Sequence, residues 1–320
     1  MPSRTLLIWN PGSGRVRRSP RALDGLRSAV GEACGRAARD AAEVCSAVRE
    51  LAPGPDDLLC VAGGDGTLQA ILTALDEIGG EWPRFVMLQA GSTNMTAVDH
   101  QGRRRLDSAS EAVRAWIAAG HPGGRRIRRR VLRIESGARA PLLGFFFGIG
   151  AITEGVRIFE ERLRGVGRPG EWAGGLAAAR VALSAVLGRT AVPGELEVRT
   201  DWSGEGVAWD SVRVLAQIAS TLDRLILGAR PFWGTEAGAL DVTRVEADAR
   251  HLGRRLWRVA LGRPGRHLRS AEGYASHATD RLVLDFEGPF ILDGERFELA
   301  AGDGPLVLTA PREIEWVVPW

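Results

Sequence analysis

The chain has 320 residues, 45% of them hydrophobic and 25% charged, so it can bury a large core without disulfides or a bound metal. Its 3 cysteines show no paired spacing, which favours neither a disulfide framework nor a zinc knuckle and fits a reducing cytosol. The net charge is only +3, but all 42 basic residues are arginine. The absence of lysine excludes a Walker P-loop and a protein-kinase site in standard form, because both place a lysine at the phosphates.

The N-terminal half alternates short apolar runs with helical patterns. Strands are expected at 5–9, 58–62 and 84–89, and helices at 20–33, 67–75 and 108–119. This alternation predicts an α/β domain with a parallel sheet covered on both faces. Ligands of such a domain bind at the carboxyl ends of the strands.

The pattern changes at His121-Pro122-Gly123-Gly124, where helical periodicity stops. The sequence therefore predicts an α/β domain over residues 1–122 and an all-β sandwich or flattened barrel over 123–320. Whether the last strand of the chain joins the sheet of the first domain stays open. One helix is expected at 174–187. Strands are expected at 127–135, 142–147, 196–200, 212–218, 240–245, 282–286, 290–299, 306–309 and 314–318.

No export signal or membrane span is expected. The apolar run at 5–9 is too short for a signal peptide, and 142–152 is about half of the ~20 residues that a spanning helix needs. A cytoplasmic protein is the expectation.

A glycine cluster joins the strand at 58–62 to the following helix. It consists of Gly63, Gly64, Asp65, Gly66 and Thr67. Glycines let the backbone approach a polyphosphate, and the helix directs free N–H groups at it. Asp65 would then bind Mg²⁺ or accept a proton from an attacking hydroxyl. Taken alone, the cluster favours a tight turn with Asp65 as a helix cap.

Two further loops follow strands in the same way. The first contains Asn10, Pro11, Gly12, Ser13 and Gly14, and the second contains Gly91, Ser92, Thr93 and Asn94. Three such loops at the same ends of three parallel strands predict one shared crevice for a nucleotide and its phosphates.

Together with Asp293-Gly294-Glu295 near the C-terminus, these motifs resemble the diacylglycerol kinase catalytic-domain superfamily, which includes bacterial lipid kinases, sphingosine kinases and ceramide kinases. The resemblance implies a kinase that binds ATP with Mg²⁺ between an α/β domain and a β-sandwich. A membrane lipid alcohol, such as diacylglycerol, ceramide or a sphingoid base, would be phosphorylated. The resemblance places the general base on Asp293 or Asp65. It also places Glu295 in the site, beside Asp293. Without the other motifs, Asp293-Gly294 would indicate an ordinary hairpin turn.

The chain departs from the family pattern at two places. Ser92-Thr93 stands where many relatives have Thr-Gly, and Ala237 stands where relatives carry an Asp before Leu-Asp, so a structural Mg²⁺ site at Ala237 is not expected. With no lysine, Arg157, Arg164 or Arg168 is a candidate to neutralise the transferred phosphoryl group.

The arginine runs 103–105 and 125–133 are candidate contacts to an anionic membrane surface, which predicts peripheral membrane association. A solvated strand face explains them equally well. No nucleic-acid-reading motif is present, so a nucleic-acid partner is not expected. A soluble-substrate kinase of the NAD kinase type, a non-catalytic nucleotide- or lipid-binding regulator and a homodimer all stay open.

Overall fold

The structure is a computed structural model that describes residues 4–91, 94–102, 104–121, 123–137, 139–154, 196–202, 209–225 and 228–320. The chain forms two compact units, one of residues 1–130 with 312–320 and one of residues 131–311. It passes between them twice, within β5 (Arg125–Glu135) and within β15 (Leu306–Val318). The boundary expected after residue 122 precedes β5, whereas the units divide inside that strand.

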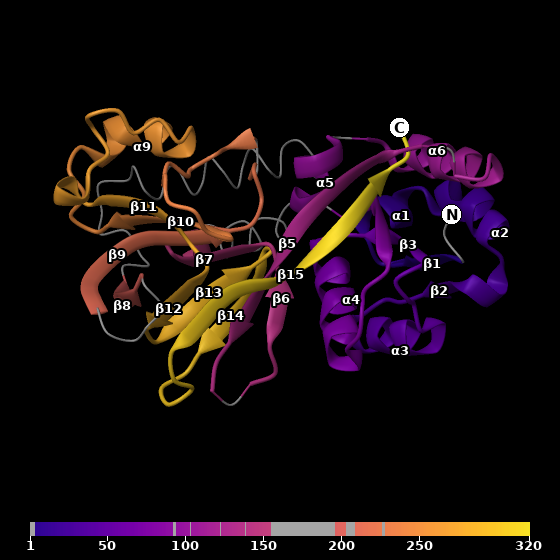
Figure 1. Ribbon diagram of the computed structural model, residues 1–320, viewed down its shortest axis with the longest axis horizontal. Helices are drawn as coiled ribbons and strands as arrows, with labels where there is room; N and C mark the ends of the chain where they lie inside the picture. Colours follow the sequence, from indigo (N-terminus) through magenta and orange to yellow (C-terminus); the bar gives the residue numbers. More distant parts are fainter. Residues whose placement is uncertain are drawn as a thin grey trace. The chain divides into compact units, whose positions relative to one another are not determined.

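The first unit is built on a parallel sheet with strand order β2-β1-β3-β4-β15 (Figure 1). Its own strands are β1 (Thr5–Trp9), β2 (Gly35–Ala37), β3 (Leu58–Gly63) and β4 (Arg84–Gln89). Every residue of β3 is buried, as expected for the centre of a sheet that is covered on both faces.

Helices cover both faces of this sheet. They are α1 (Gly14–Arg18), α2 (Asp24–Val30), α3 (Ala41–Leu51), α4 (Asp65–Ile78), α5 (Met95–Gln101) and α6 (Leu106–Ala118), with 3₁₀ turns η1 (Pro20–Leu23) and η2 (Glu32–Cys34). Leu26 of α2 and Val113 of α6 pack with Leu7, Val86 and Leu88 of the sheet in one apolar cluster. Helices α3 and α4 pack against each other on the other face of the sheet (Figure 1). The predicted α/β fold is confirmed.

The second unit is strand-rich, as predicted, and its pairings are antiparallel. The strands run in the order β14-β13-β7-β9-β8-β12-β15, with β10 and β11 joined through β9 and β6 paired to β5. Their bounds are β6 (Leu142–Gly144), β7 (Phe146–Gly150), β8 (Leu196–Asp201), β9 (Trp209–Ser220), β10 (Leu240–Glu246), β11 (Tyr274–Thr279), β12 (Arg281–Asp285), β13 (Gly288–Leu292) and β14 (Glu295–Leu299). Alternate residues of these strands, among them Phe147, Val214, Leu284 and Phe290, form one buried core.

Several elements differ from the sequence prediction. The strand expected at 290–299 is two strands joined by a turn at Asp293-Gly294, where both residues have positive φ. Strands expected at 306–309 and 314–318 form the single strand β15. The additional helix α9 (Leu252–Ala260) and 3₁₀ turn η4 (Ser270–Glu272) lie between β10 and β11. The helix expected at 174–187 lies outside the described residues.

Among the described residues, no helix combines the length and the apolar character needed to cross a membrane.

Candidate nucleotide site and acidic hairpin

The three glycine loops of the first unit meet at one edge of its sheet. Trp9 pairs with Ala62, and Ala62 pairs with Leu88, so β1, β3 and β4 end side by side. The Asn10 amide donates to the Ala62 carbonyl at 2.9 Å, and the Gly91 amide donates to the Gly63 carbonyl at 3.1 Å. Backbone hydrogen bonds therefore join the loops at the end of the sheet where α/β proteins bind ligands.

The first loop is shaped by Asn10. Its Oδ1 accepts the Gly12 amide at 2.7 Å, and its Nδ2 lies 3.4 Å from Thr67 Oγ1 at the start of α4. Ser13 precedes α1 and makes no side-chain capping bond, and Gly14 is the first residue of that helix. Asn10 thus orients its own loop and links it to the loop after β3.

The loop between β3 and α4 packs so tightly against its surroundings that it needs its glycines. A Cβ on Gly63 would lie 2.5 Å from Thr67 Cβ, and a Cβ on Gly91 would lie 2.5 Å from Gly64 Cα. Gly64 is the N-cap of α4 and has no side chain to cap it, and Gly66 lies in the first turn. The first amides of a 14-residue helix are therefore left without a side-chain cap, which is the arrangement that binds phosphate oxygens.

Asp65 is buried and turned towards the start of α5. Its Oδ2 accepts the Met95 amide at 2.9 Å and its Oδ1 accepts the Thr96 amide at 3.3 Å. Burial raises the pKa of this carboxyl above its ordinary value, while the bonds from Met95 and Thr96 act in the opposite direction. The carboxylate therefore works as an acceptor for the first amides of α5.

The loop between β4 and α5 is closed by Asn94, whose φ is +51°. Asn94 Oδ1 accepts the Gly91 amide at 2.9 Å, and its Nδ2 donates to the Gly91 carbonyl at 2.6 Å. Ser92 and Thr93, which were predicted to contact the nucleotide, lie outside the described residues.

The Mg²⁺ predicted at Asp65 has no preformed set of side-chain ligands among the described residues. Among the described residues, no group of three or more His, Cys, Asp or Glu side chains could hold a metal ion. Both oxygens of Asp65 also accept hydrogen bonds from backbone amides. The residues present thus fit a helix-holding role for Asp65 better than a metal-ligand role.

Arg15 is a residue that the sequence analysis missed. Its amide donates to the Ala90 carbonyl at 3.0 Å, and its guanidinium donates to the carbonyls of Gln89 at 3.2 Å and Arg104 at 2.9 Å. It fixes the end of β4 against the first loop. The only signal for it is its place directly after Gly14, since its acceptors are backbone carbonyls that no motif records.

In the second unit, Asp293 and Gly294 form the two-residue turn of the β13–β14 hairpin, with φ of +51° and +93°. The Asp293 carboxylate is buried and accepts the Phe145 amide at 3.1 Å and the Phe146 amide at 2.9 Å. These bonds fall at the break between β6 and β7, which explains why the strand expected at 142–147 is interrupted. A Cβ on Gly144 would lie 2.5 Å from Asp293 Oδ2, so the carboxylate fits against this glycine.

Glu295 is the first residue of β14 and pairs with Leu292. Its side chain is exposed, although desolvation by neighbouring protein raises its pKa above the ordinary value. Asp293 and Glu295 therefore differ: the first is held by backbone amides, and the second is an accessible carboxylate whose pKa is shifted towards neutrality.

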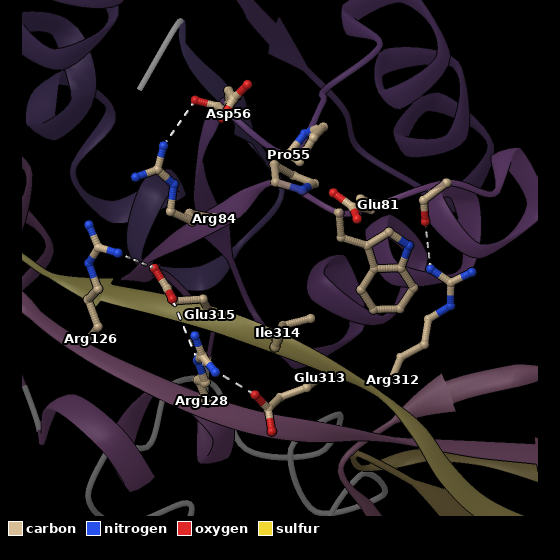
Figure 2. Close-up of a pocket in the computed structure, with 13 residues that line it drawn as sticks. Pro55, Asp56, Glu81, Arg84, Arg126, Arg128, Arg312, Glu313, Ile314 and Glu315 are labelled. Carbon is tan, nitrogen blue, oxygen red and sulfur yellow. Dashed lines mark hydrogen bonds and ion pairs between the residues drawn. The ribbon is translucent and has the colours of Figure 1, made fainter. Parts of the chain in front are cut away.

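A hollow of about 630 Å³ lies at the opposite end of the first unit's sheet, where residues preceding β3 and β4 meet β5 and β15 (Figure 2). Figure 2 shows Arg126 directed at Glu315 and Arg128 between Glu313 and Glu315. The N–O distance is 3.3 Å in the Arg126–Glu315 pair and 3.7 Å in both pairs of Arg128. Four arginines and four acidic residues line the hollow, so their charges balance. This balance does not favour an anion there.

The same pairs account for much of the arginine run expected to meet a membrane. Besides Arg126 and Arg128, Arg129 bonds at 2.9 Å to Asp99, whose side chain is fully buried. Of the run 103–105, Arg103 lies outside the described residues and Arg105 pairs with Asp107 at 2.9 Å. Each of the described arginines named here therefore has an acidic partner within the first unit.

Two remaining predictions concern the second unit. Ala237 is exposed and precedes β10. Nearby, burial and the charge of Asp223 raise the pKa of Asp241. Arg157, Arg164 and Arg168 lie outside the described residues.

Comparisons with known proteins relate the first unit to one protein family. Residues 4–119 match the family model of the diacylglycerol kinase catalytic domain, a span that contains all three glycine loops but not Asp293. Two solved structures of a candidate diacylglycerol kinase from Bacillus anthracis str. Sterne are each 14% identical with a TM-score of 0.64, cover 98% of this chain and are themselves covered over 96% and 97% of their length. A diacylglycerol kinase structure from the same organism is 12% identical, with a TM-score of 0.58 and coverage of 98% and 96%. At these identities the structures establish a shared fold alone. No curated protein matches the chain.

Proposed function

We propose that this chain is an ATP-dependent lipid kinase, because residues 4–119 match the family model of the diacylglycerol kinase catalytic domain, as their motifs predicted. It would transfer the γ-phosphate to the hydroxyl of a membrane lipid alcohol, with diacylglycerol, ceramide and a sphingoid base as candidates. The observation that carries the proposal is the start of α4, where glycines expose the first amides of the helix beside two further loops.

The proposed site holds phosphates without lysine. Amides at the starts of α4 and α1 would bind the phosphate oxygens, and the positive end of the α4 dipole would stabilise their charge. The lipid hydroxyl oxygen attacks the γ-phosphorus, the bond to the β-phosphate oxygen breaks, and ADP leaves. The hydroxyl proton passes to a carboxylate base.

Glu295 is the carboxylate best suited to take that proton. It is exposed, whereas Asp65 and Asp293 each accept two backbone amides. A raised pKa also makes Glu295 a stronger base than an ordinary glutamate. Asp293 would then position Glu295 through the hairpin turn, and Asp65 would position the loop after β4.

The test is transfer of labelled phosphate from ATP to mixed micelles of diacylglycerol, ceramide or sphingosine, with NAD as a soluble acceptor and with Mg²⁺ present or omitted. Label in the organic phase that is lost in Glu295→Gln supports the proposal and identifies the head group. Label on NAD alone would replace it with a soluble-substrate kinase. Binding of a fluorescent ATP analogue without any transfer would instead favour a nucleotide-binding regulator.

A further inference from the structure

Helix α9 of the second unit has one buried and one exposed face. Val259, with Leu252 beside it, packs into a cluster with Val245, Leu268 and Tyr274. On the other side, Trp257 is 51% exposed and Leu261, at the C-cap, is 48% exposed. Residues four apart share a helix face, so these two side chains form one apolar strip towards solvent.

This strip is unusual for the chain. Among the described residues, three large hydrophobic side chains are classed as exposed, and two of them are Trp257 and Leu261. The third, Ile78, stands alone at the end of α4. Scattered exposed residues need no explanation, but a paired Trp and Leu on a helix face is a candidate contact surface.

The surroundings of the strip are strongly basic. From residue 249 to residue 271 the chain has seven arginines, two histidines and no acidic residue. Arg255 faces inward, where it bonds to Glu272 at 2.6 Å and lies over Tyr274. Arg254, Arg263 and Arg266 are exposed and make no ion pair with any residue that the structure describes.

One contact and one pKa shift reflect the positive charge around the strip. The Arg258 guanidinium lies 4.8 Å from the centre of the Trp257 ring. Burial and the positive charges of Arg258 and Arg266 lower the pKa of His267. In contrast, Arg126, Arg128 and Arg129 of the first unit all have acidic partners.

We propose that the exposed face of α9 and the following loop, defined by Arg254, Trp257, Leu261, Arg263 and Arg266, docks on an anionic phospholipid bilayer. Trp257 and Leu261 would enter the headgroup region, where an indole ring is favoured, and the guanidiniums would contact lipid phosphates. The apolar pair selects a bilayer over a nucleic acid, because arginines alone would serve phosphate binding. The inference rests on the proposed function only in that a lipid acceptor must be reached at a membrane.

The experiment is co-sedimentation of the full chain with vesicles of phosphatidylcholine alone or with added phosphatidylglycerol, at low and high salt. Binding is expected to need the anionic lipid and to weaken with salt. Each lost arginine, as in Arg254→Ser or Arg263→Ser, should weaken binding about fivefold, from about 1 kcal/mol per charge. Trp257→Ala with Leu261→Ser should weaken it by at least about tenfold, and Trp257→Phe much less.

Matched controls are Ile78→Ser, which removes an equally exposed apolar side chain, and Arg281→Ser, which removes an exposed arginine on β12. Both should bind like the unaltered chain, and circular dichroism should show all variants folded. Unchanged vesicle binding by the Trp257/Leu261 double variant would overturn the proposal. So would equal binding to both vesicle types, or tighter binding to duplex DNA than to anionic vesicles.

Vesicle-binding and activity measurements together distinguish failure of the docking proposal from failure of the proposed kinase function. If the docking proposal holds, the Trp257/Leu261 double variant should phosphorylate a short-chain, water-soluble lipid alcohol as fast as the unaltered chain and act more slowly only on vesicle substrate. If the unaltered chain phosphorylates no lipid but binds vesicles, and the double variant loses this binding, the docking surface is supported and the kinase function is refuted. Normal phosphorylation of vesicle lipid by the double variant would refute the docking surface and support the kinase.

Discussion

Replacement of Asp293 by alanine should destabilise the second unit before it says anything about catalysis. The carboxylate accepts the amides of Phe145 and Phe146 at the break between β6 and β7, and alanine leaves both without that acceptor. Each buried amide that loses its partner costs about 1–3 kcal/mol. Alanine at the Asp293 φ of +51° adds about 1 kcal/mol. The expected loss is therefore about 3–7 kcal/mol.

Urea unfolding followed by circular dichroism measures this loss. Asp293→Asn should cost less, since asparagine tolerates positive φ and keeps one carbonyl oxygen to accept an amide. Glu287→Ala, at an exposed acidic residue two positions after β12, is the matched control and should change stability by less than about 0.5 kcal/mol. A loss below about 1 kcal/mol for Asp293→Ala would show that the two amide bonds do not hold the turn.

Three further predictions concern other positions. Gly91→Ala places a Cβ 2.5 Å from Gly64 Cα, so it should lower the melting temperature and weaken binding of a fluorescent ATP analogue at least about tenfold. Burial raises the pKa of the Cys60 thiol to about 12, so Cys60 should resist iodoacetamide at neutral pH in the native chain and react after denaturation, as read by peptide mass spectrometry. Because the pKa of Glu295 lies above its ordinary value of 4.5, kcat/KM should rise with pH through a value above 4.5, and this limb should vanish in Glu295→Gln.

Each of these has a clear contrary result. Full ATP-analogue binding by Gly91→Ala would mean that the Gly64–Gly91 contact can relax without disturbing the site. Rapid alkylation of Cys60 in folded protein would show that the β3 strand opens readily. An unchanged acidic limb in Glu295→Gln would assign that limb to another group and remove the main argument for Glu295 as base.

The α/β unit could be predicted from sequence because its signals are local. A fully apolar strand followed at once by glycines, as at 58–67, specifies a strand, a turn and a helix within ten or so neighbouring residues. Helix α3 was missed although its signal is also local. Asp40 accepts the Glu43 amide at 2.9 Å and Glu43 accepts the Arg39 amide at 2.7 Å, which is a capping pattern readable as Asp-x-x-Glu.

The roles of the acidic residues could not be predicted, because their partners are distant in sequence. Nothing near Asp293 indicates that its acceptors would serve the amides of Phe145 and Phe146. Likewise, the run of arginines at 125–133 gave no sign that Arg126 would meet Glu315 on β15. Sequence patterns reveal residue types and short spacings, whereas these bonds depend on strand pairing across the whole chain.

Asp65 and Asp293 share one structural device, and this limits what mutagenesis of either can prove. Each is a buried carboxylate after or within a glycine-containing turn, and each accepts two successive backbone amides from another segment. Alanine at either position removes those acceptors, so lost activity would follow from a displaced loop as readily as from a missing base. Glu295 has no such bonds among the described residues, and its replacement by glutamine keeps its shape. A pH profile of Glu295→Gln therefore separates proton transfer from loop positioning, which substitutions of the two aspartates do not.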